Sequence, residues 1–301
     1  MTATRPTGRT GPFDLRTALA GVRALVLDAD GVLLYAGMPL PGAVAALEAL
    51  EAAAIPYRVV TNYSLAHRES LAASVSRQFE RPVDPARLIT AASAAAAHTA
   101  RHHPGEALFV LASRDAIREW AGQHTLTPDE ADDPATKIGA VVIGDAGDEL
   151  SFRNLNIAFR AVRSGAAFVA MHRNPWWVTS RGVTLDSGAL VIGLEQALRQ
   201  QATIAGKPSR VVFREAVREL AAEAGAPRLR AGDVAMVGDD LQVDVGGAHR
   251  AGLRGILVLT GKTDAAAFEA AERGGRLLGP ARPDGVGAGV LAVVEALIAS
   301  R

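Results

Sequence analysis

Short apolar runs alternate with helical segments along the chain, and each run ends at a polar or glycine-containing turn. Residues 24–27 are apolar and lead directly into Asp28-Ala29-Asp30-Gly31. A run of this length that is bounded by a turn predicts a buried strand. A helix is expected at 43–53, where apolar residues keep helical spacing, and a second strand at 57–60. The strand-helix-strand order predicts parallel pairing with a right-handed crossover.

The same alternation continues to the end of the chain. We expect strands at 107–111, 138–143, 168–171, 234–237 and 255–259, and helices at 65–79, 88–101, 113–123, 152–164, 190–199, 211–224, 248–251 and 290–300. Ser113 is a suitable N-cap for one helix, and Gly165 and Gly225 are suitable C-terminal residues for two others.

A second, separate series of alternating strands and helices is expected between residues 102 and 201. We therefore predict a Rossmann-like α/β core with a parallel sheet over 21–100 and 201–301, and an inserted α/β cap domain over 101–200. Residues 1–20 are expected to form a flexible tail, because their sequence carries no clear hydrophobic period.

Composition narrows the class of protein. The chain has 301 residues with 32 basic and 32 acidic side chains, so no overall field favours nucleic acid or acidic membranes. It has no cysteine, which excludes disulfides and thiolate ligands and suits a reducing cytoplasm. The N-terminal segment lacks the apolar core of a signal peptide, and no uncharged apolar stretch reaches about 18 residues. We expect a cytoplasmic protein without a membrane span.

Polar clusters occur where expected strands end or helices begin. They are Asp28 with Asp30, Thr61 with Asn62, Lys207, and Asp239 with Asp244. Ligands of open α/β sheets bind just beyond the carboxyl ends of the strands. Carboxylates that lie close together repel unless they share a cation or a proton, and Mg²⁺ accepts carboxylates together with water and phosphate. A hydroxyl, an amide and an ammonium suit a phosphoryl group, so phosphoryl transfer is predicted.

Four motifs in this order resemble those of the haloacid dehalogenase (HAD) superfamily of phosphatases. They are DADGV at 28–32, TN at 61–62, GKP at 206–208 and GDDLQVD at 238–244. The resemblance covers residues 21–265, and the long stretch between the second and third motifs resembles members with a large α/β (class II) cap. Those members include pyridoxal phosphatase, phosphoglycolate phosphatase and 4-nitrophenylphosphatase.

Three longer segments are most similar to a narrower branch of this group. They are AMHRNPWW, GKPS and VGDDLQVDVGGAHRAGLRGILVLTGK. The branch holds haloacid dehalogenase-like hydrolase domain-containing protein 2 and the phospholysine/phosphohistidine inorganic pyrophosphate phosphatase.

The resemblance implies catalytic roles for three residues. Asp28 is expected to be the nucleophile and a Mg²⁺ ligand. Asp30 is expected to bind Mg²⁺ through its backbone carbonyl, while its carboxyl first protonates the leaving oxygen and then activates water. Lys207 is expected to neutralise the Asp28 carboxylate and the transferred group. Dehalogenases lack the second aspartate, so Asp30 favours phosphate chemistry.

The resemblance also implies a phosphate site and the rest of the metal site. Thr61 and Asn62 are expected to hold the phosphoryl oxygens. Asp239 is the third expected protein ligand of Mg²⁺, and Asp244 is expected outside the ligand set, where it orients a metal-bound water or Lys207.

The chain departs from these relatives at the rim and in the cap. Tyr63 stands where many relatives have asparagine, and the segment 171–174 differs from their Thr-Asn-x-Asp. Adjacent aromatic side chains next to polar ones favour a ligand site. We expect the following cap residues to set substrate choice: Arg173, Asn174, Trp176 and Trp177.

The leading hypothesis is a Mg²⁺-dependent phosphatase that acts on a small phosphorylated metabolite through an aspartyl-phosphate. A phosphatase for phosphohistidine, phospholysine or inorganic pyrophosphate is the alternative. A phospho-accepting signalling domain is disfavoured by the cap-sized insertion, and an inactive binding protein by the complete set of acids. Relatives with this cap often form dimers through it, so a homodimer through the cap is an alternative to a monomer.

Two other sequence features resemble functional sites. Gly261-Lys262-Thr263 resembles the end of a P-loop but lacks the required spacing, so we do not expect a P-loop phosphate site there. His98, His102 and His103 lack nearby carboxylates in the sequence and are expected to be solvated.

Overall fold

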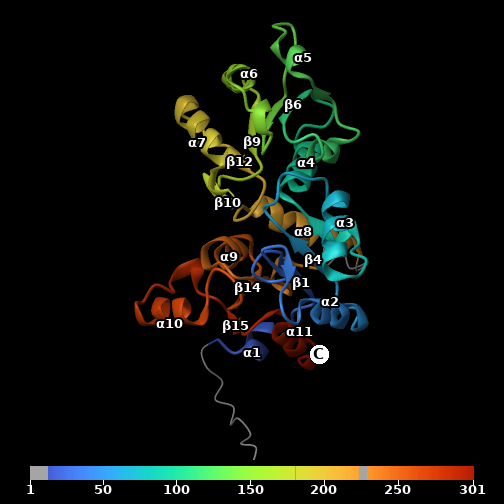
Figure 1. Ribbon diagram of the computed structural model, residues 1–301, viewed down its shortest axis with the longest axis vertical. Helices are drawn as coiled ribbons and strands as arrows, with labels where there is room; N and C mark the ends of the chain where they lie inside the picture. Colours follow the sequence, from blue (N-terminus) through green and yellow to red (C-terminus); the bar gives the residue numbers. More distant parts are fainter. Residues whose placement is uncertain (1–12, 180, 224–228) are drawn as a thin grey trace, which may run out of the picture. The chain divides into compact units, whose positions relative to one another are not determined.

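A computed structural model of the protein describes residues 13–179, 181–223 and 229–301 (Figure 1). Contacts along the chain divide it into two compact units. Unit 1 comprises Met1–Tyr57 and Leu220–Arg301, and unit 2 comprises Arg58–Glu219. The two chain crossings between the units fall within the strand at 57–60 and the helix at 210–223.

Unit 1 contains four parallel strands in the order β15-β14-β13-β1. Their bounds are β1 Ala24–Asp28, β13 Val234–Gly238, β14 Arg254–Val258 and β15 Gly285–Gly287. Every residue of β1 and β13 is buried. Parallel strands that are covered on both faces need such continuous apolar runs, which explains why the sequence predicted them correctly.

The remaining elements of unit 1 are short. They are α1 Leu15–Leu19, β2 Leu34–Tyr35, β3 Met38–Pro39, α2 Ala43–Ala52, the π-helical turn η5 Leu241–Val245, α9 Gly246–Ala251, α10 Ala265–Arg273 and α11 Val290–Ala299. The expectation of a tail over 1–20 is wrong for α1, because Leu19 is fully buried and anchors this helix in the core. Residues 1–12 lie outside the described part of the chain.

Unit 2 contains a five-stranded parallel sheet in the order β12-β9-β8-β6-β7. Its strands are β6 Leu108–Leu111, β7 Thr125–Leu126, β8 Ala140–Ile143, β9 Ala167–Ala170 and β12 Thr203–Ile204. The core beside this sheet includes Phe109, Ile143, Ile157 and Phe168, each at most 3% exposed. Unit 2 thus has a sheet and a core of its own.

Other elements of unit 2 flank this sheet or precede it. The helices are α3 Arg68–Phe79, α4 Ala91–His102, α5 Pro128–Asp132, α6 Phe152–Arg163, α7 Ser187–Leu198 and α8 Arg210–Glu223. Strand β4, Tyr57–Val60, pairs in parallel with β5, Leu88–Ile89. Strands β10, Trp176–Thr179, and β11, Gly182–Leu185, form an antiparallel hairpin.

The α/β class with parallel sheets is confirmed, and the local differences have physical causes. Residues 113–123 were expected to form an α-helix but contain the short 3₁₀ helix η2, Ala116–Trp120. Ser113 Oγ does accept a hydrogen bond from Ala116 N at 3.0 Å. The helix ends where the backbone leaves helical angles, at Ala121 with ψ 128° and at Gly122 with φ +84°. Trp120 is buried, and its ring nitrogen donates to Thr99 Oγ1 at 3.1 Å.

Two further helix boundaries can be compared with the sequence. The expected helix at 88–101 begins later, because Leu88–Ile89 pair with β4 and Thr90 caps α4 by accepting from Ser93 N. Gly165 follows α6 at φ +105°, as its C-terminal position predicted. Gly225, the other predicted C-terminal residue, lies outside the described residues.

Candidate metal centre and phosphate site

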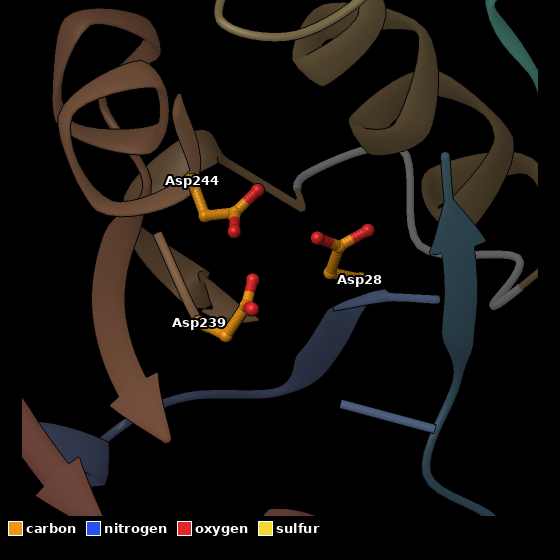
Figure 2. Close-up of side chains that lie close together, drawn as sticks. All are labelled: Asp28, Asp239 and Asp244. Carbon is orange, nitrogen blue, oxygen red and sulfur yellow. The ribbon is translucent and has the colours of Figure 1, made fainter. Parts of the chain in front are cut away.

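Three carboxylates meet at one edge of the sheet of unit 1. Asp28 ends β1, Asp239 directly follows β13, and Asp244 lies in η5. Strands β1 and β13 are adjacent and parallel, with Leu27 paired to Val237, so both end at the same edge. Figure 2 shows the three side chains turned toward one shared space. One carboxylate oxygen of each lies within 4.8 Å of the others.

Burial makes it costly to bring these three acids together unless positive charge or a shared proton compensates them. Asp28 is 7% exposed, Asp239 is 8% exposed and Asp244 is fully buried. Bringing like charges together away from water is costly unless an opposite charge neutralises them. Carboxylate oxygens are the ligands that Mg²⁺ and Ca²⁺ take in proteins. The residues therefore fit a hard divalent cation.

The turn after β1 separates Asp28 from Asp30. Leu33 N and Leu34 N both donate to Ala29 O at 2.9 Å, and Gly31 N donates to Leu34 O at 2.7 Å. Gly31 has φ +76°, which a residue with a side chain rarely adopts. As a result Asp28 points into the carboxylate group, where its Oδ1 accepts from Ala29 N at 2.7 Å, whereas Asp30 is exposed.

The loop Gly261-Lys262-Thr263, which does not have the spacing of a P-loop, holds Asp239. Lys262 N donates to Asp239 Oδ2 at 2.6 Å, and Thr263 N donates to Asp239 O at 3.1 Å. Gly261 leaves room for this contact, since a Cβ there would lie 2.0 Å from Asp239 Oδ2. The signal in the sequence was the glycine-lysine-threonine sequence shortly after the strand β14, which ends at Val258.

Asp244 is fixed by its own turn. Its Oδ2 accepts from Asp240 N at 3.1 Å, and Asp240 Oδ1 accepts from Gln242 N and Val243 N. Burial favours a raised pKa for Asp240, but hydrogen bonds from the Lys262 ammonium and from these backbone amides outweigh it, so the pKa lies below its ordinary value. The Asp244 carboxylate thus lies in the same group as those of Asp28 and Asp239. Its expected role outside the ligand set stays a prediction.

The second and third motifs meet within unit 2. Lys207 N donates to Asn62 Oδ1 at 2.7 Å, and Asn62 Nδ2 donates back to Lys207 O at 3.0 Å. Gly206 makes this approach feasible, because a Cβ there would lie 2.6 Å from Asn62 Oδ1. Thr61 and Lys207 are buried, and Thr61 Oγ1 accepts from Tyr63 N at 3.2 Å. A hydroxyl, an amide and an ammonium side chain are therefore carried by two adjoining turns.

The predicted cap residues lie in one segment but in different surroundings. Arg173 donates to the buried carboxylate of Glu195 at 2.7 Å, so it is part of an ion pair with α7. Asn174 is exposed. Trp176 and Trp177 lie in β10 and are 57% and 38% exposed.

Parallel α/β units with acids, a hydroxyl, an amide and a lysine at their strand ends define a phosphoryl-transfer class of hydrolase. Two family models identify it further. One, described as haloacid dehalogenase-like hydrolase, matches residues 25–124, and another, described as HAD-hydrolase-like, matches residues 204–286. The chain belongs to the HAD superfamily and is a phosphatase, as its four motifs predicted.

Curated relatives share most of the chain's length. It is 33% identical over 245 residues to haloacid dehalogenase-like hydrolase domain-containing protein 2 from Bos taurus, covering 81% of this chain and 87% of that protein. It is 30% identical over 250 residues to the phospholysine phosphohistidine inorganic pyrophosphate phosphatase from Homo sapiens, covering 81% and 85%.

Solved structures of phosphatases have the same fold. The p-nitrophenyl phosphatase from Archaeoglobus fulgidus has a TM-score of 0.77 and 28% identity, over 91% of this chain and 99% of that one. The glycerol phosphate phosphatase from Mycobacterium tuberculosis in complex with magnesium has a TM-score of 0.73 and 27% identity, over 92% and 78%. Within the described residues, no helix combines the length and apolar character needed to cross a membrane.

Proposed function

We propose that this HAD phosphatase hydrolyses a small phosphate monoester in a Mg²⁺-dependent reaction that passes through an aspartyl-phosphate on Asp28. The observation that carries the proposal is the group of three buried carboxylates, with oxygens within 4.8 Å of one another, at the end of β1, directly after β13 and in η5. Clustered carboxylate oxygens of this kind suit a divalent cation.

Asp28 is the proposed nucleophile. Its carboxylate oxygen attacks phosphorus, an oxygen–phosphorus bond forms, and the bond between phosphorus and the ester oxygen breaks. The hydrogen bond from Ala29 N at 2.7 Å orients the carboxylate for this attack. Asp30 protonates the leaving oxygen, and its carboxylate then takes a proton from the water that attacks phosphorus and releases Asp28. Exposure of Asp30 gives its carboxyl ready exchange of protons with solvent.

The metal ligands proposed are the carboxylates of Asp28 and Asp239 and the backbone carbonyl of Asp30, with Asp244 beside them. Bound there, Mg²⁺ would neutralise charge on the phosphoryl oxygens. Lys262 N and the Gly261 backbone keep the Asp239 carboxylate in place. The printed title of one structural neighbour names magnesium as its ligand, which supports the choice of ion.

Thr61, Asn62 and Lys207 are proposed to hold the transferred group. We propose that they act on the same phosphoryl group as Asp28, because the four motifs occur in the order found in HAD phosphatases. Residues 101–200 are the proposed cap, and within it Arg173, Asn174, Trp176 and Trp177 are proposed to set substrate choice. The exposed indoles of β10 offer apolar surface to a leaving group.

Phosphorus–nitrogen and pyrophosphate bonds are the second candidate substrates. The similarity that favours them is the 30% identity to an enzyme named for phospholysine, phosphohistidine and pyrophosphate. A panel of sugar phosphates, glycerol phosphate, pyridoxal phosphate, nucleotides, pyrophosphate and phosphohistidine separates the two. We further propose a cytoplasmic location, which suits a chain without cysteine, and leave pairing through the cap to a sedimentation measurement.

The test of the reaction compares wild type with Asp28→Asn on 4-nitrophenyl phosphate, with Mg²⁺ and with EDTA. We expect EDTA to stop turnover and Asp28→Asn to lower kcat by about 10³-fold or more, because the nucleophile is lost. Asp148→Asn is the matched control, since Asp148 is an exposed aspartate of unit 2. Turnover that survives both EDTA and Asp28→Asn would refute the proposal.

A further inference from the structure

A loop of unit 2, residues 61–67, carries the proposed phosphate-holding residues and lies along one edge of the five-stranded sheet. Four sets of hydrogen bonds hold this loop. Asn62 bonds with the backbone of Lys207, and Ser64 Oγ lies 3.2 Å from His172 Nε2. Leu65 O accepts from Ser113 Oγ at 2.6 Å, and Asp115 Oδ2 accepts from His67 N at 3.0 Å. The edge of the sheet therefore sets the path of this loop.

The register of the sheet explains why these partners form a row. Leu111 pairs with Ile143, Ile143 with Ala170, and Ala170 with Ile204. Continuing two residues beyond each strand gives the following row across β6, β8, β9 and β12: Ser113, Asp145, His172 and Gly206. All four strands are parallel, so these positions lie beyond their carboxyl ends, where open α/β sheets place ligand-binding loops.

Within this row, the buried side chain of His172 contacts the loop at Ser64. It is 3% exposed, and its Nε2 lies 3.2 Å from Ser64 Oγ and 3.7 Å from Asp186 Oδ1. Its Nδ1 has no hydrogen-bond partner among the residues that the structure describes. Burial lowers the pKa of His172, and this effect outweighs the negative charges of Asp186 and Asp145, which raise it. A neutral imidazole therefore faces Ser64 near pH 7.

His172 also connects the two halves of the phosphate site through the backbone. Met171 O, immediately before it, accepts from Gly206 N at 2.8 Å, and Gly206 begins the turn that carries Lys207. Ser64, on its other side, is two residues after Asn62. One side chain thus joins the turn after β4 to the strand that supports the Lys207 turn.

We propose that His172 is a positioning residue, which holds Asn62 and Thr61 in their phosphate-binding conformation through Ser64. The inference rests on the proposed phosphate-holding role of these two residues. Losing the contact should loosen the grip on the phosphoryl group while leaving the nucleophile and the metal ligands unchanged.

The test compares His172→Ala, His172→Gln and Ser64→Ala with wild type. We expect His172→Ala to raise KM for 4-nitrophenyl phosphate and the inhibition constant of inorganic phosphate by about fivefold to tenfold, the effect of one lost hydrogen bond, with kcat changed by less than about twofold. His172→Gln should recover most of the affinity, because its amide nitrogen reaches a position similar to imidazole Nε2. The double variant Ser64→Ala/His172→Ala should be no worse than His172→Ala alone.

Hydrogen exchange of the peptide that covers residues 61–67 gives a readout that does not need activity. We expect faster exchange in His172→Ala and wild-type exchange in His98→Ala, a control that removes a partly buried histidine from α4. Unchanged exchange together with an unchanged phosphate constant would overturn the inference even if Asp28→Asn abolishes turnover. If wild type lacks phosphatase activity, the proposed reaction fails, and exchange alone decides whether His172 positions the loop.

Discussion

Gly261 leaves no space for a side chain next to Asp239, so Gly261→Ala should displace this proposed metal ligand without altering any of the proposed ligands themselves. A Cβ at Gly261 would lie 2.0 Å from Asp239 Oδ2 and 2.6 Å from Gly31 Cα, whereas ordinary contact begins at 3.4 Å. The carboxylate oxygen or the loop must therefore move by about 1.4 Å. Metal ligation tolerates deviations of about 0.2 Å, so a displacement of this size removes Asp239 from the ligand set.

The expected size of the effect follows from the cost of overpacking. An extra methyl group in a filled site costs about 1–3 kcal/mol, which corresponds to about 5-fold to 150-fold in affinity if the strain is released by moving the carboxylate. We therefore expect Gly261→Ala to weaken Mg²⁺ binding by at least about fivefold, and to need more Mg²⁺ for half-maximal phosphatase activity.

Isothermal titration calorimetry with Mg²⁺, alongside a denaturation curve, measures this effect. Gly193→Ala is the matched control, because Gly193 lies in α7 and a Cβ there would meet nothing within 4 Å. We expect Gly193→Ala to keep wild-type affinity and to gain up to about 1 kcal/mol of stability from helix propensity. Wild-type Mg²⁺ affinity in a folded Gly261→Ala protein would refute the steric reasoning.

Three further predictions concern unit 2. Phe109→Ala should lower the free energy of unfolding by about 3–5 kcal/mol, since this ring is 1% exposed in the core, and a smaller loss in denaturant titration would show that the core can collapse around it. Burial and nearby positive charges lower the pKa of His98 from 6.5 to about 4. The unfolded chain thus binds more protons between these pH values, so stability should fall as pH drops through this range and His98→Gln should flatten the slope; equal slopes would contradict this. The proposed specificity residues are Arg173, Asn174, Trp176 and Trp177. Replacing all four by alanine should change the relative activity across the substrate panel, and an unchanged ranking of substrates would refute this assignment.

Much of the fold could be predicted because buried parallel strands leave a continuous apolar run in the sequence. Residues 57–60 and the start of the strand at 234 match the observed β4 and β13. The β10–β11 hairpin was missed for the opposite reason. Pro175 and the polar residues before it indicated a loop, and the paired residues Trp176 and Leu185 are 57% and 69% exposed, so they belong to no buried apolar run.

The candidate site was predictable where it depends on strand ends and unpredictable where it depends on a local turn. Asp28 and Asp239 follow neighbouring parallel strands, so their meeting could be inferred. The approach of Asp244 depends on η5, a π-helical turn in which Val245 N and Asp244 N both donate to Asp240 O. The wider turn brings the Asp244 carboxylate into the group. The support from Gly261 and Lys262 arises from tertiary contact, which no spacing rule describes.

The fastening of residues 61–67 to the edge of the five-stranded sheet has a consequence for protein engineering. A chimera that imports a relative's segment for the proposed cap, residues 101–200, would replace Ser113, Asp115 and His172 while keeping the host's Ser64 and His67. The contacts across this seam would then be mismatched, and the graft would lose phosphate affinity for reasons unrelated to its new specificity. A chimera should therefore take residues 61–67 and the proposed cap from the same relative.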